Sequence, residues 1–375
     1  MRRIQTDFIR HDLDRKMVFI TGPRQVGKTT LAREVAAAWN SCEYLNFDAD
    51  VDRPAILRQE WDRERDLVIL DEVHKLKRWK TRLKGVYDTE GIPPRILVTG
   101  SARLDVYRRG GDSLAGRYFL HRLYPLSVRE LRGTAGPGEI LDRLNRRGGF
   151  PEPYLAASDT DADRWRLTHT ERIIRGDVQD LEPVRDVPTM LLLVDLLRER
   201  VGLGVSYASL ARDLEISPHT VKRWIGTLEN MYVLFRVTPF HGNRARSLLK
   251  EPKMYFYDTG VVRGGPGAKL ENTVAVCLRK WLHFREDTRG EETGLHYVRD
   301  KEKREVDFLV TIGGKHVHLL EVKSSEDSLH PALKYYSGRM KVAHAAQLVG
   351  SLRRSRKLGE IRVLDAAAFL DGLDA

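Results

Sequence analysis

Gly22-Pro-Arg-Gln-Val-Gly27-Lys28-Thr29-Thr30 is the most informative stretch of this chain, and it follows directly after the apolar run 17–20. The stretch fits the pattern GxxxxGK(S/T), and the helix-prone run 31–39 follows it. A loop of this kind directs backbone N–H groups at a polyphosphate, where the helix dipole also favours anions. We therefore predict that ATP binds along the whole loop, namely Gly22, Pro23, Arg24, Gln25, Val26, Gly27, Lys28, Thr29 and Thr30.

Two side chains of this loop have expected roles in the chemistry. Lys28 would reach the β- and γ-phosphates, and Thr29 would place its hydroxyl group on Mg²⁺. The alternative is an ordinary glycine-containing turn, which the flanking strand and helix patterns disfavour. The sequence therefore predicts a nucleoside triphosphate site.

A second apolar strand ends in two carboxylates, Asp71 and Glu72. This is the form expected of a Walker B strand beside the P-loop strand, in which Asp71 holds the Mg²⁺ shell and Glu72 polarises the attacking water. Phosphoryl transfer needs little beyond positioning and charge neutralisation, so these few groups are nearly the whole catalytic inventory. The alternative, an acidic turn after a buried strand, is disfavoured because a P-loop precedes it.

A third strand, 95–99, carries hydroxyl groups at its carboxyl end, where α/β sheets place ligand-contacting residues. Ser101 is favoured over Thr99 as the residue that senses the γ-phosphate or orients water. Arg117 and Arg122 are candidates for the positive group that stabilises the transition state, supplied in trans to a neighbouring subunit. A solvated loop position explains either arginine equally well.

Composition limits the class of protein. A chain of 375 residues with 41% hydrophobic content is expected to form two or three domains. Cys42 and Cys277 have no ligand-like spacing, which disfavours a disulfide framework or a zinc site and favours a reducing cytosol. No export signal or membrane-spanning run is evident, so we expect a cytoplasmic protein without a membrane partner. The net charge of +11 favours DNA or RNA as a partner.

The order of strand and helix patterns predicts an α/β chain in four parts. Residues 1–125 alternate strands and helices, as in a P-loop α/β domain, which is the expected ATPase core. A helical lid or connector is expected at 126–201 and a winged helix at 202–250. The remaining part, 251–375, is expected to be a second α/β domain.

The winged-helix prediction rests on a helix that begins after Ser217, its expected N-cap. Val221, Ile225 and Leu228 form its buried stripe. Basic side chains off that stripe or in the following wing are the candidates for nucleic-acid contact, namely His219, Lys222, Arg223, Arg244 and Arg246. Winged helices also serve as protein-packing modules, and that alternative stays open.

The last part of the chain carries a second group of acidic residues. Asp307 lies near the start of one strand, a Gly313-Gly314 turn follows, and the return strand ends in Glu321-Val-Lys323. Glu321 and Lys323 share a face of their strand, and the hairpin can bring Asp307 near them. Two carboxylates beside a lysine are what metal-assisted phosphodiester hydrolysis requires. A solvated charged hairpin is the alternative, which the apolar residues before Glu321 disfavour.

Several motifs together carry a family resemblance: GPRQVGKTT at 22–30, LDEVHK at 70–75, LVTGSA at 97–102, LAGRYFLHRLYPLSVREL at 114–131, GGFPEPY at 148–154 and KMYFYDTG at 253–260. The chain resembles a family of prokaryotic AAA+-type ATPases, with an AAA-14-like P-loop domain followed by a DUF4143-like region. This resemblance implies a homo-oligomer, with a hexameric ring favoured.

The C-terminal acidic residues resemble the PD-(D/E)xK pattern of restriction-endonuclease-like nucleases and Holliday-junction resolvases. The resemblance implies a restriction-endonuclease-like α/β domain in which Asp307 and Glu321 bind metal and Lys323 supports catalysis. It gives Glu271 an accessory acidic role at the metal site, with Mg²⁺ or Mn²⁺ as the ion.

Two functions follow from these patterns. The first is a DNA-processing ATPase, a ring-forming motor for branch migration or unwinding of branched or duplex DNA, with metal-dependent cleavage as a further activity. The second is a nucleotide-dependent regulator or sensor that binds DNA or a protein and carries an inactive nuclease-like domain. A protein-remodelling function has no positive feature in its support.

Overall fold

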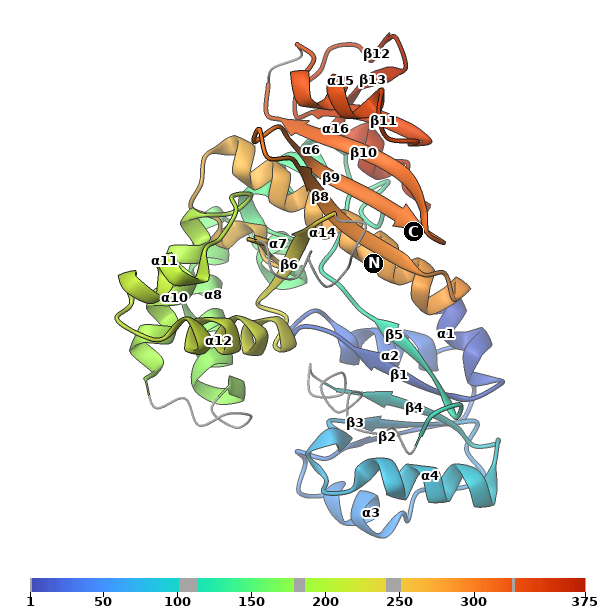
Figure 1. The fold of residues 1–375 in the computed structure, drawn as a ribbon. Coiled ribbons are helices and arrows are strands. Elements are labelled where there is room, and N and C mark those ends of the chain that lie inside the picture. Colours follow the sequence, from blue (N-terminus) through green and yellow to red (C-terminus); the bar gives the residue numbers. More distant parts are fainter. Residues whose placement is uncertain (1, 101–113, 179–185, 241–250, 326–327, 375) are drawn as a thin grey trace. The chain divides into compact units, whose positions relative to one another are not determined.

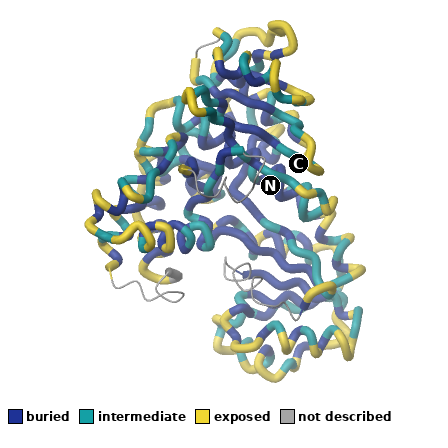
Figure 2. Tube along the Cα trace, in the orientation of Figure 1, coloured by how far each residue is buried: buried dark blue, intermediate teal, exposed yellow. Residues whose placement is uncertain are grey.

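The computed structural model describes residues 2–100, 114–178, 186–240, 251–325 and 328–374. The chain divides into two compact units, Met1–Tyr124 and Pro125–Ala375 (Figure 1). Figure 2 shows that the strands of both units are largely buried, whereas the outer helices carry many exposed positions. None of the described helices combines the length and the apolar character that a membrane span requires.

A parallel sheet of five strands, in the order β2-β3-β4-β1-β5, forms the centre of the N-terminal unit. Its strands are β1 (Met17–Thr21), β2 (Cys42–Asn46), β3 (Leu67–Asp71), β4 (Arg95–Thr99) and β5 (Tyr118–Arg122). Every residue of β1 and β3 is buried, which accounts for their continuous apolar sequence. Parallel strands end at one edge of a sheet, so Thr21, Asp71 and Thr99 lie near one another. The predicted α/β fold of this part is confirmed.

Helices cover this sheet and fix the strand that leads into the P-loop. The described helices of the unit are α1 (Thr6–Leu13), α2 (Lys28–Ala36), α3 (Arg53–Arg58) and α4 (Trp79–Glu90). Phe19 of β1 stacks on Tyr118 of β5 with ring centroids 4.4 Å apart, and the Trp79 ring lies 5.6 Å from the Phe19 ring. These rings belong to one buried core, which holds β1 between its neighbours.

Helices dominate the first half of the C-terminal unit. They are α6 (Pro137–Arg147), α7 (Pro151–Leu155), α8 (Asp159–Arg172), α10 (Val187–Glu199), α11 (Tyr207–Asp213) and α12 (Pro218–Asn230). The predicted N-cap of α12 is confirmed, because Ser217 Oγ accepts a hydrogen bond from the Thr220 backbone N–H at 3.0 Å. Val221, Ile225 and Leu228 are buried, as their spacing predicts.

An eight-stranded mixed sheet fills the second half, in the order β12-β13-β11-β10-β9-β8-β6-β7. Its strands are β6 (Leu234–Pro239), β7 (Lys253–Phe256), β8 (Thr293–Arg299), β9 (Glu305–Ile312), β10 (Lys315–Lys323), β11 (His344–Val349), β12 (Arg356–Leu358) and β13 (Ile361–Asp365). The predicted hairpin at Gly313-Gly314 is confirmed, with Ile312 opposite Lys315. Strand β6 pairs antiparallel with β7 and parallel with β8. The hairpin that follows α12 is therefore one edge of this sheet.

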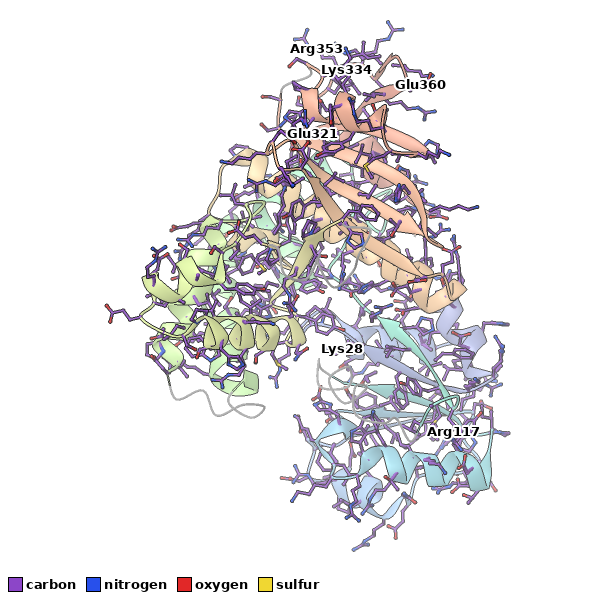
Figure 3. All side chains as sticks on the ribbon, in the orientation of Figure 1. Lys28, Arg117, Glu321, Lys334, Arg353 and Glu360 are labelled. Carbon is purple, nitrogen blue, oxygen red and sulfur yellow. The ribbon has the colours of Figure 1, made fainter. Side chains whose placement is uncertain are left out.

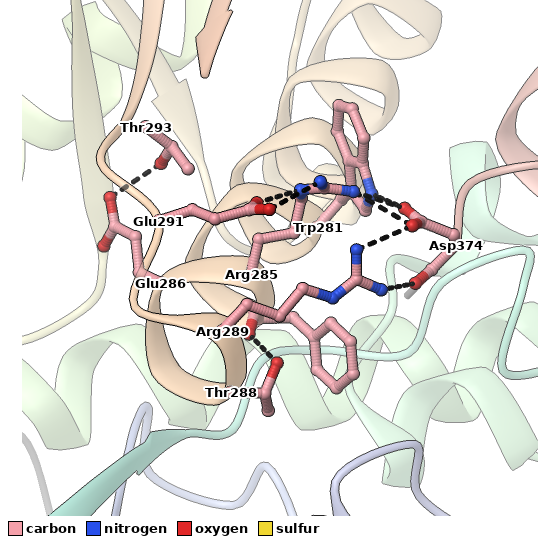
Figure 4. A network of polar contacts seen from close by, with 9 residues as sticks. Trp281, Arg285, Glu286, Thr288, Arg289, Glu291, Thr293 and Asp374 are labelled. Carbon is pink, nitrogen blue, oxygen red and sulfur yellow. Dashed lines mark hydrogen bonds and ion pairs between the residues drawn. The ribbon is translucent and has the colours of Figure 1, made fainter. Parts of the chain in front are cut away.

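Three helices pack against the mixed sheet: α14 (Pro266–Arg289), α15 (Pro331–Ser337) and α16 (Ala366–Asp371). Asp374 ties the end of the chain to α14 (Figure 4). Its carboxylate accepts from Arg285 Nη1 at 2.9 and 3.1 Å, from Arg289 Nη1 at 2.9 Å, and from the Trp281 indole N–H. Burial acts to raise the Asp374 pKa, but these hydrogen bonds and the arginine charges outweigh it and lower that pKa to about 2. The network anchors the C-terminal half of α14.

Candidate functional site

The P-loop joins β1 to α2 through two glycines with positive φ. Gly22 has φ 145°, and a Cβ atom added there would lie 2.1 Å from the Leu123 carbonyl oxygen. Gly27 has φ 96° and is the N-cap of α2, which begins at Lys28. Only glycine tolerates both requirements, close backbone approach and left-handed geometry. The loop is therefore shaped to turn its backbone toward a ligand at the start of a helix.

Lys28 is folded back onto its own loop. Its side-chain ammonium donates to the Pro23 carbonyl oxygen at 2.6 Å and to the Gly22 carbonyl oxygen at 3.1 Å, and the residue is 8% exposed. Carbonyl oxygens are uncharged acceptors, so an anionic phosphate would be a stronger partner for the same ammonium group. The position of Lys28 fits its predicted role toward the β- and γ-phosphates.

Asp71 is the centre of a group of hydroxyl donors. Its Oδ2 accepts from Thr29 Oγ1 at 2.9 Å and from Tyr44 Oη at 2.6 Å, while Oδ1 accepts from Thr99 Oγ1. The carboxylate is buried at the carboxyl end of β3, and these three donors fix its orientation. Thr29 and Asp71 thus present adjacent oxygens of the kind that Mg²⁺ prefers, and the donor set fits the predicted ion.

Glu72 follows Asp71 in a left-handed backbone conformation with φ 57°. Its backbone N–H donates to the Thr99 carbonyl oxygen at 3.0 Å, which ties the turn to β4. Burial raises the pKa of its side chain, and the charge of Lys75, 3.4 Å away, opposes part of that effect. A carboxylate whose proton affinity is raised is a better acceptor for a proton of a bound water.

Two hydroxyl residues of this site have roles that the sequence reasoning did not favour. Thr99 contacts Asp71, whereas Ser101, the favoured candidate, lies outside the described residues. Tyr44 was not predicted at all. Burial first, and then its hydrogen bond to Asp71, raise the pKa of Tyr44 to about 12, so it stays a donor at neutral pH. Its one sequence signal is its place in the apolar-rich stretch that forms β2, which pairs with β3.

The two arginine candidates lie at opposite ends of β5. Met17 pairs with Tyr118 and Thr21 with Arg122, so Arg122 lies at the P-loop edge and Arg117 at the other edge. Figure 3 shows Arg117 far from Lys28. Arg117 donates to both oxygens of Asp88, at 2.5 and 3.1 Å, and this pairing lowers the Asp88 pKa to about 2. Within one chain, Arg117 is directed away from the P-loop of that chain.

The exposed face of α12 carries the predicted nucleic-acid residues. His219, Lys222 and Arg223 are exposed, on the side opposite the buried stripe. Arg244 and Arg246 lie outside the described residues. The three described side chains are placed where a partner could reach them.

The C-terminal acidic residues surround a lysine that the sequence reasoning missed. Lys253, from β7, places its Nζ 2.9 Å from Asp307 Oδ1 and 3.3 Å from Glu271 Oε1. It also lies 2.8 Å from Glu305 Oε1. Asp307 Oδ2 accepts the Val322 backbone N–H at 3.0 Å, which brings Asp307 next to β10 as the hairpin predicts.

Glu321 and Lys323 form a separate ion pair, with Lys323 Nζ 2.8 Å from Glu321 Oε1. His330 Nδ1 lies 3.4 Å from the same oxygen. Burial above all, and then the charge of Asp307, raise the Glu321 pKa to about 8. The same two causes raise the Glu271 pKa to about 7. These carboxyl groups share a buried, crowded and acidic environment.

This arrangement does not fit a divalent metal ion. Across the part of the chain that the structure describes, no group of three or more His, Cys, Asp and Glu side chains has the geometry to hold one. The physical reason is the Lys253 ammonium, which the oxygens of Glu271 and Asp307 already bind. Metal binding by Glu271, Asp307 and Glu321 remains a prediction that these contacts do not favour.

Three family models match consecutive parts of the chain. An AAA domain matches residues 14–132. A domain of unknown function, DUF8612, matches 138–265, and another, DUF4143, matches 266–368. The expected succession of an AAA-14-like domain and a DUF4143-like region is confirmed.

Similar curated proteins include two that are described as uncharacterized. A protein of Mycobacterium tuberculosis is 32% identical over 250 residues, which cover 66% of this chain and 55% of the relative. A protein of Methanocaldococcus jannaschii is 24% identical over 312 residues, covering 68% of this chain and 65% of the relative. The chain therefore spans about half the length of the mycobacterial relative.

Similar chains among solved structures include the Thermotoga maritima RuvB Holliday junction branch migration motor. It is 17% identical, with a TM-score of 0.35, and the match covers 63% of this chain and 90% of that one. A Walker-type ATPase of Pyrococcus abyssi has 16% identity and a TM-score of 0.42 over 70% of this chain and 94% of that one. The family match and the P-loop geometry together identify the N-terminal part as an AAA-type P-loop ATPase domain.

Proposed function

We propose that this protein hydrolyses ATP at the N-terminal P-loop and uses the resulting conformational change to act on DNA. The observation that carries the ATPase part is the cluster around Asp71, in which Thr29, Tyr44 and Thr99 place their hydroxyl groups on one buried carboxylate. Such a cluster at the carboxyl edge of a parallel sheet, next to a P-loop, is built for a phosphate ligand and its counter-ion.

Each side chain of this site has one task in the reaction. Lys28 leaves the Gly22 and Pro23 carbonyl oxygens and neutralises the terminal phosphates. Thr29 and Asp71 would hold Mg²⁺, which supplies charge neutralisation on the phosphate oxygens when it is bound. Glu72 orients the attacking water and accepts its proton, a role that its raised pKa supports.

DNA is the partner that charge favours. The chain carries a net charge of +11, and His219, Lys222 and Arg223 are exposed on α12. A helix that follows a short helix and a turn, with basic residues on its outer face, is a common way to contact the major groove. Branched or duplex DNA is the proposed substrate, and branch migration or unwinding is the proposed activity.

The test is ATP turnover measured with a four-way junction, a linear duplex and single-stranded DNA over a range of salt concentrations. We expect DNA to stimulate turnover, and Lys222→Ala/Arg223→Ala to weaken binding and flatten its salt dependence by about two units of slope. Arg164→Ala/Arg172→Ala, two exposed arginines of α8, is the matched control and should leave both unchanged. ATP turnover that is the same with and without each of these DNAs would contradict the proposal.

A ring is the proposed assembly, because an AAA-type site is completed by an arginine from a neighbour. Arg117 supports this arrangement, since it lies at the sheet edge opposite its own P-loop. Mixing inactive Lys28→Ala protein with inactive Arg117→Ala protein should restore part of the turnover, because some mixed sites have both residues. The same mixing experiment is then done with Arg122→Ala in place of Arg117→Ala. If neither mixture regains turnover, neither arginine acts as a finger on a neighbouring subunit.

A nucleotide-dependent regulator with an inactive nuclease-like domain is the second candidate, and one observation favours it. Lys253 already pairs with Glu271 and Asp307, two of the three acidic residues that metal-dependent cleavage would use. A labelled four-way junction incubated with Mg²⁺ or Mn²⁺ should then stay intact with wild-type protein. Cleavage that is lost in Lys323→Ala would instead establish a nuclease alongside the ATPase.

A further inference from the structure

We infer that Lys253 is the built-in cation of the C-terminal carboxylate cluster and fills the position that a divalent metal ion would need. The cluster consists of Lys253, Glu271, Glu305 and Asp307. It has this role independently of nucleotide binding by the N-terminal unit.

The ammonium group of Lys253 is buried among acidic side chains from α14 and β9. Its Nζ lies 2.8 Å from Glu305, 2.9 Å from Asp307 and 3.3 Å from Glu271, and the side chain is 1% exposed. Nζ also lies 5.6 Å from the centre of the Tyr297 ring, within the range of a cation–π contact. The three ion pairs hold the charged ammonium group inside the protein.

Two of the three carboxylates that would bind a metal, Asp307 and Glu271, already accept hydrogen bonds. Asp307 accepts from Lys253 at Oδ1 and from the Val322 backbone N–H at Oδ2. Glu271 Oε1 accepts from Lys253 and, at 2.6 Å, from Tyr255 Oη. A hard dication requires oxygen ligands that it can gather around itself at short distance. Asp307 and Glu271 are thus held by donors of the protein itself, whereas Glu321 Oε2 is buried and has no hydrogen-bond partner among the described residues.

The fold also makes room for this cluster. Gly202, with φ 76°, lies so close that an added Cβ atom would sit 2.6 Å from Glu271 Oε2. A side chain at this position would therefore displace the carboxylate from Lys253. The close packing indicates that the fold is adapted to Glu271 as a buried, paired residue rather than as an open ligand.

A tethered ammonium group differs from a metal ion in two chemical respects. It cannot exchange with solvent, and it has no open coordination position at which to bind and activate a water. The cluster can thus balance three partly buried carboxylates without producing a hydroxide nucleophile. It provides charge balance in the place where the sequence pattern predicts catalysis.

Removal of this cation should turn the cluster into a metal site. Lys253→Met keeps most of the side-chain volume but removes the cation that Glu271 and Asp307 share, whereas Glu305 keeps Arg299 at 3.4 Å. We expect the variant to unfold roughly 10 °C below wild type in EDTA, because it leaves buried charges unpaired. Mn²⁺ should restore a large part of this loss, since a dication can replace the missing positive charge.

The experiment uses the full chain without nucleotide and measures thermal unfolding in EDTA and in Mn²⁺, with free Mn²⁺ counted by electron paramagnetic resonance. Wild type should unfold at the same temperature in both conditions. Lys253→Met should bind one additional Mn²⁺ per chain. Lys253→Met/Asp307→Asn should bind less, because it has one carboxylate fewer.

The Glu321→Gln variant keeps the inference open to refutation even if Lys253→Met does not fold. Glu321 does not contact Lys253 through a hydrogen bond that the structure records, but it is one of the two predicted metal ligands. Wild-type protein that binds Mn²⁺ and loses this binding in Glu321→Gln would overturn the inference. Equal Mn²⁺ binding by the two proteins supports it.

Discussion

Lys28 and Lys253 are both buried lysines of predicted sites, but they pair with different kinds of acceptor. Lys28 donates to two uncharged carbonyl oxygens of its own loop. Lys253 instead lies within 3.3 Å of three carboxylate side chains. The first ammonium can exchange its partners for a more strongly charged ligand, whereas the second already has the strongest partners that a protein offers.

The difference indicates how each region is used. A site that must bind and release an anion keeps its cation on weak, replaceable acceptors. A site whose cation is fully paired contributes to the folded structure and has no charge left for a ligand. Turnover should therefore depend on the first region, and stability should depend on buried and paired groups like those of the second.

The largest effect is expected for Lys28→Ala. ATP turnover should fall roughly 10³-fold, because a positive group on the transferring phosphate is removed. The free energy of unfolding should change little, since the lost hydrogen bonds are to carbonyl oxygens. Lys77→Ala, which removes an exposed lysine of the same unit, is the control and should keep full turnover. Turnover within a few-fold of wild type in Lys28→Ala would remove the basis of the comparison.

A third buried lysine extends the comparison. Lys280 pairs with Glu130, and both side chains are at most 2% exposed. Lys280→Met should lower the free energy of unfolding by about 4 kcal/mol, because Glu130 is left buried without its partner. Urea unfolding measures this loss, and the Lys280→Met/Glu130→Gln protein should regain much of it. If the double variant were no more stable than the single one, the lysine would matter for packing and not for charge.

The dependence of the free energy of unfolding on pH provides a further test of how buried groups control stability. Burial, and then the neighbouring His344, lower the His318 pKa from 6.5 to about 4, so the folded protein holds this imidazole neutral. The unfolded chain binds the proton more readily, and stability is therefore lost as pH falls from about 6.5 to about 4. This loss should reach roughly 3 kcal/mol at the acidic end.

Urea unfolding at pH 7 and pH 4.5 provides the measurement. His318→Gln should show a smaller difference between the two pH values than wild type does. His316→Gln, on the same strand, serves as the matched substitution. An unchanged pH difference in His318→Gln would show that another group causes the acid sensitivity.

The smallest effect is expected for Tyr44→Phe. It removes one of the hydroxyl donors on Asp71, a loss of about 1 kcal/mol or about fivefold in kcat/KM for ATP. The Mg²⁺ concentration required for half-maximal turnover should change in the same experiment. Tyr87→Phe on α4 is the control. An effect as large as that of Lys28→Ala would mean that Tyr44 has a catalytic role of its own.

Local patterns predicted the parts of the site that lie close together in sequence. The strand, the two glycines and Lys28 form one uninterrupted stretch, and Asp71 ends the next buried apolar strand. Ser217 and the Gly313-Gly314 turn are equally local, since each acts within a few residues. Their geometry follows from backbone rules that need no knowledge of the rest of the fold.

The parts that were missed depend on contacts between distant strands. Lys253 meets Asp307 only because β7 pairs with β6, β6 with β8 and β8 with β9. Tyr44 meets Asp71 only through the pairing of β2 with β3. The position of Arg117 at the far edge likewise follows from the register of β1 and β5. The sequence pattern within a single strand or helix does not predict these contacts, because they depend on how distant strands pair.

Strands β6 and β7 have a practical consequence for anyone who divides this chain. The DUF8612 and DUF4143 matches separate at residues 265 and 266, yet β6 and β7 lie before that point and complete the sheet that lies after it. A fragment beginning at Pro266 would leave β8 with an unpaired hydrogen-bonding edge, open to association with other copies. It would also lack Lys253. We expect such a fragment to aggregate on expression, whereas one beginning at Pro125 should stay in solution.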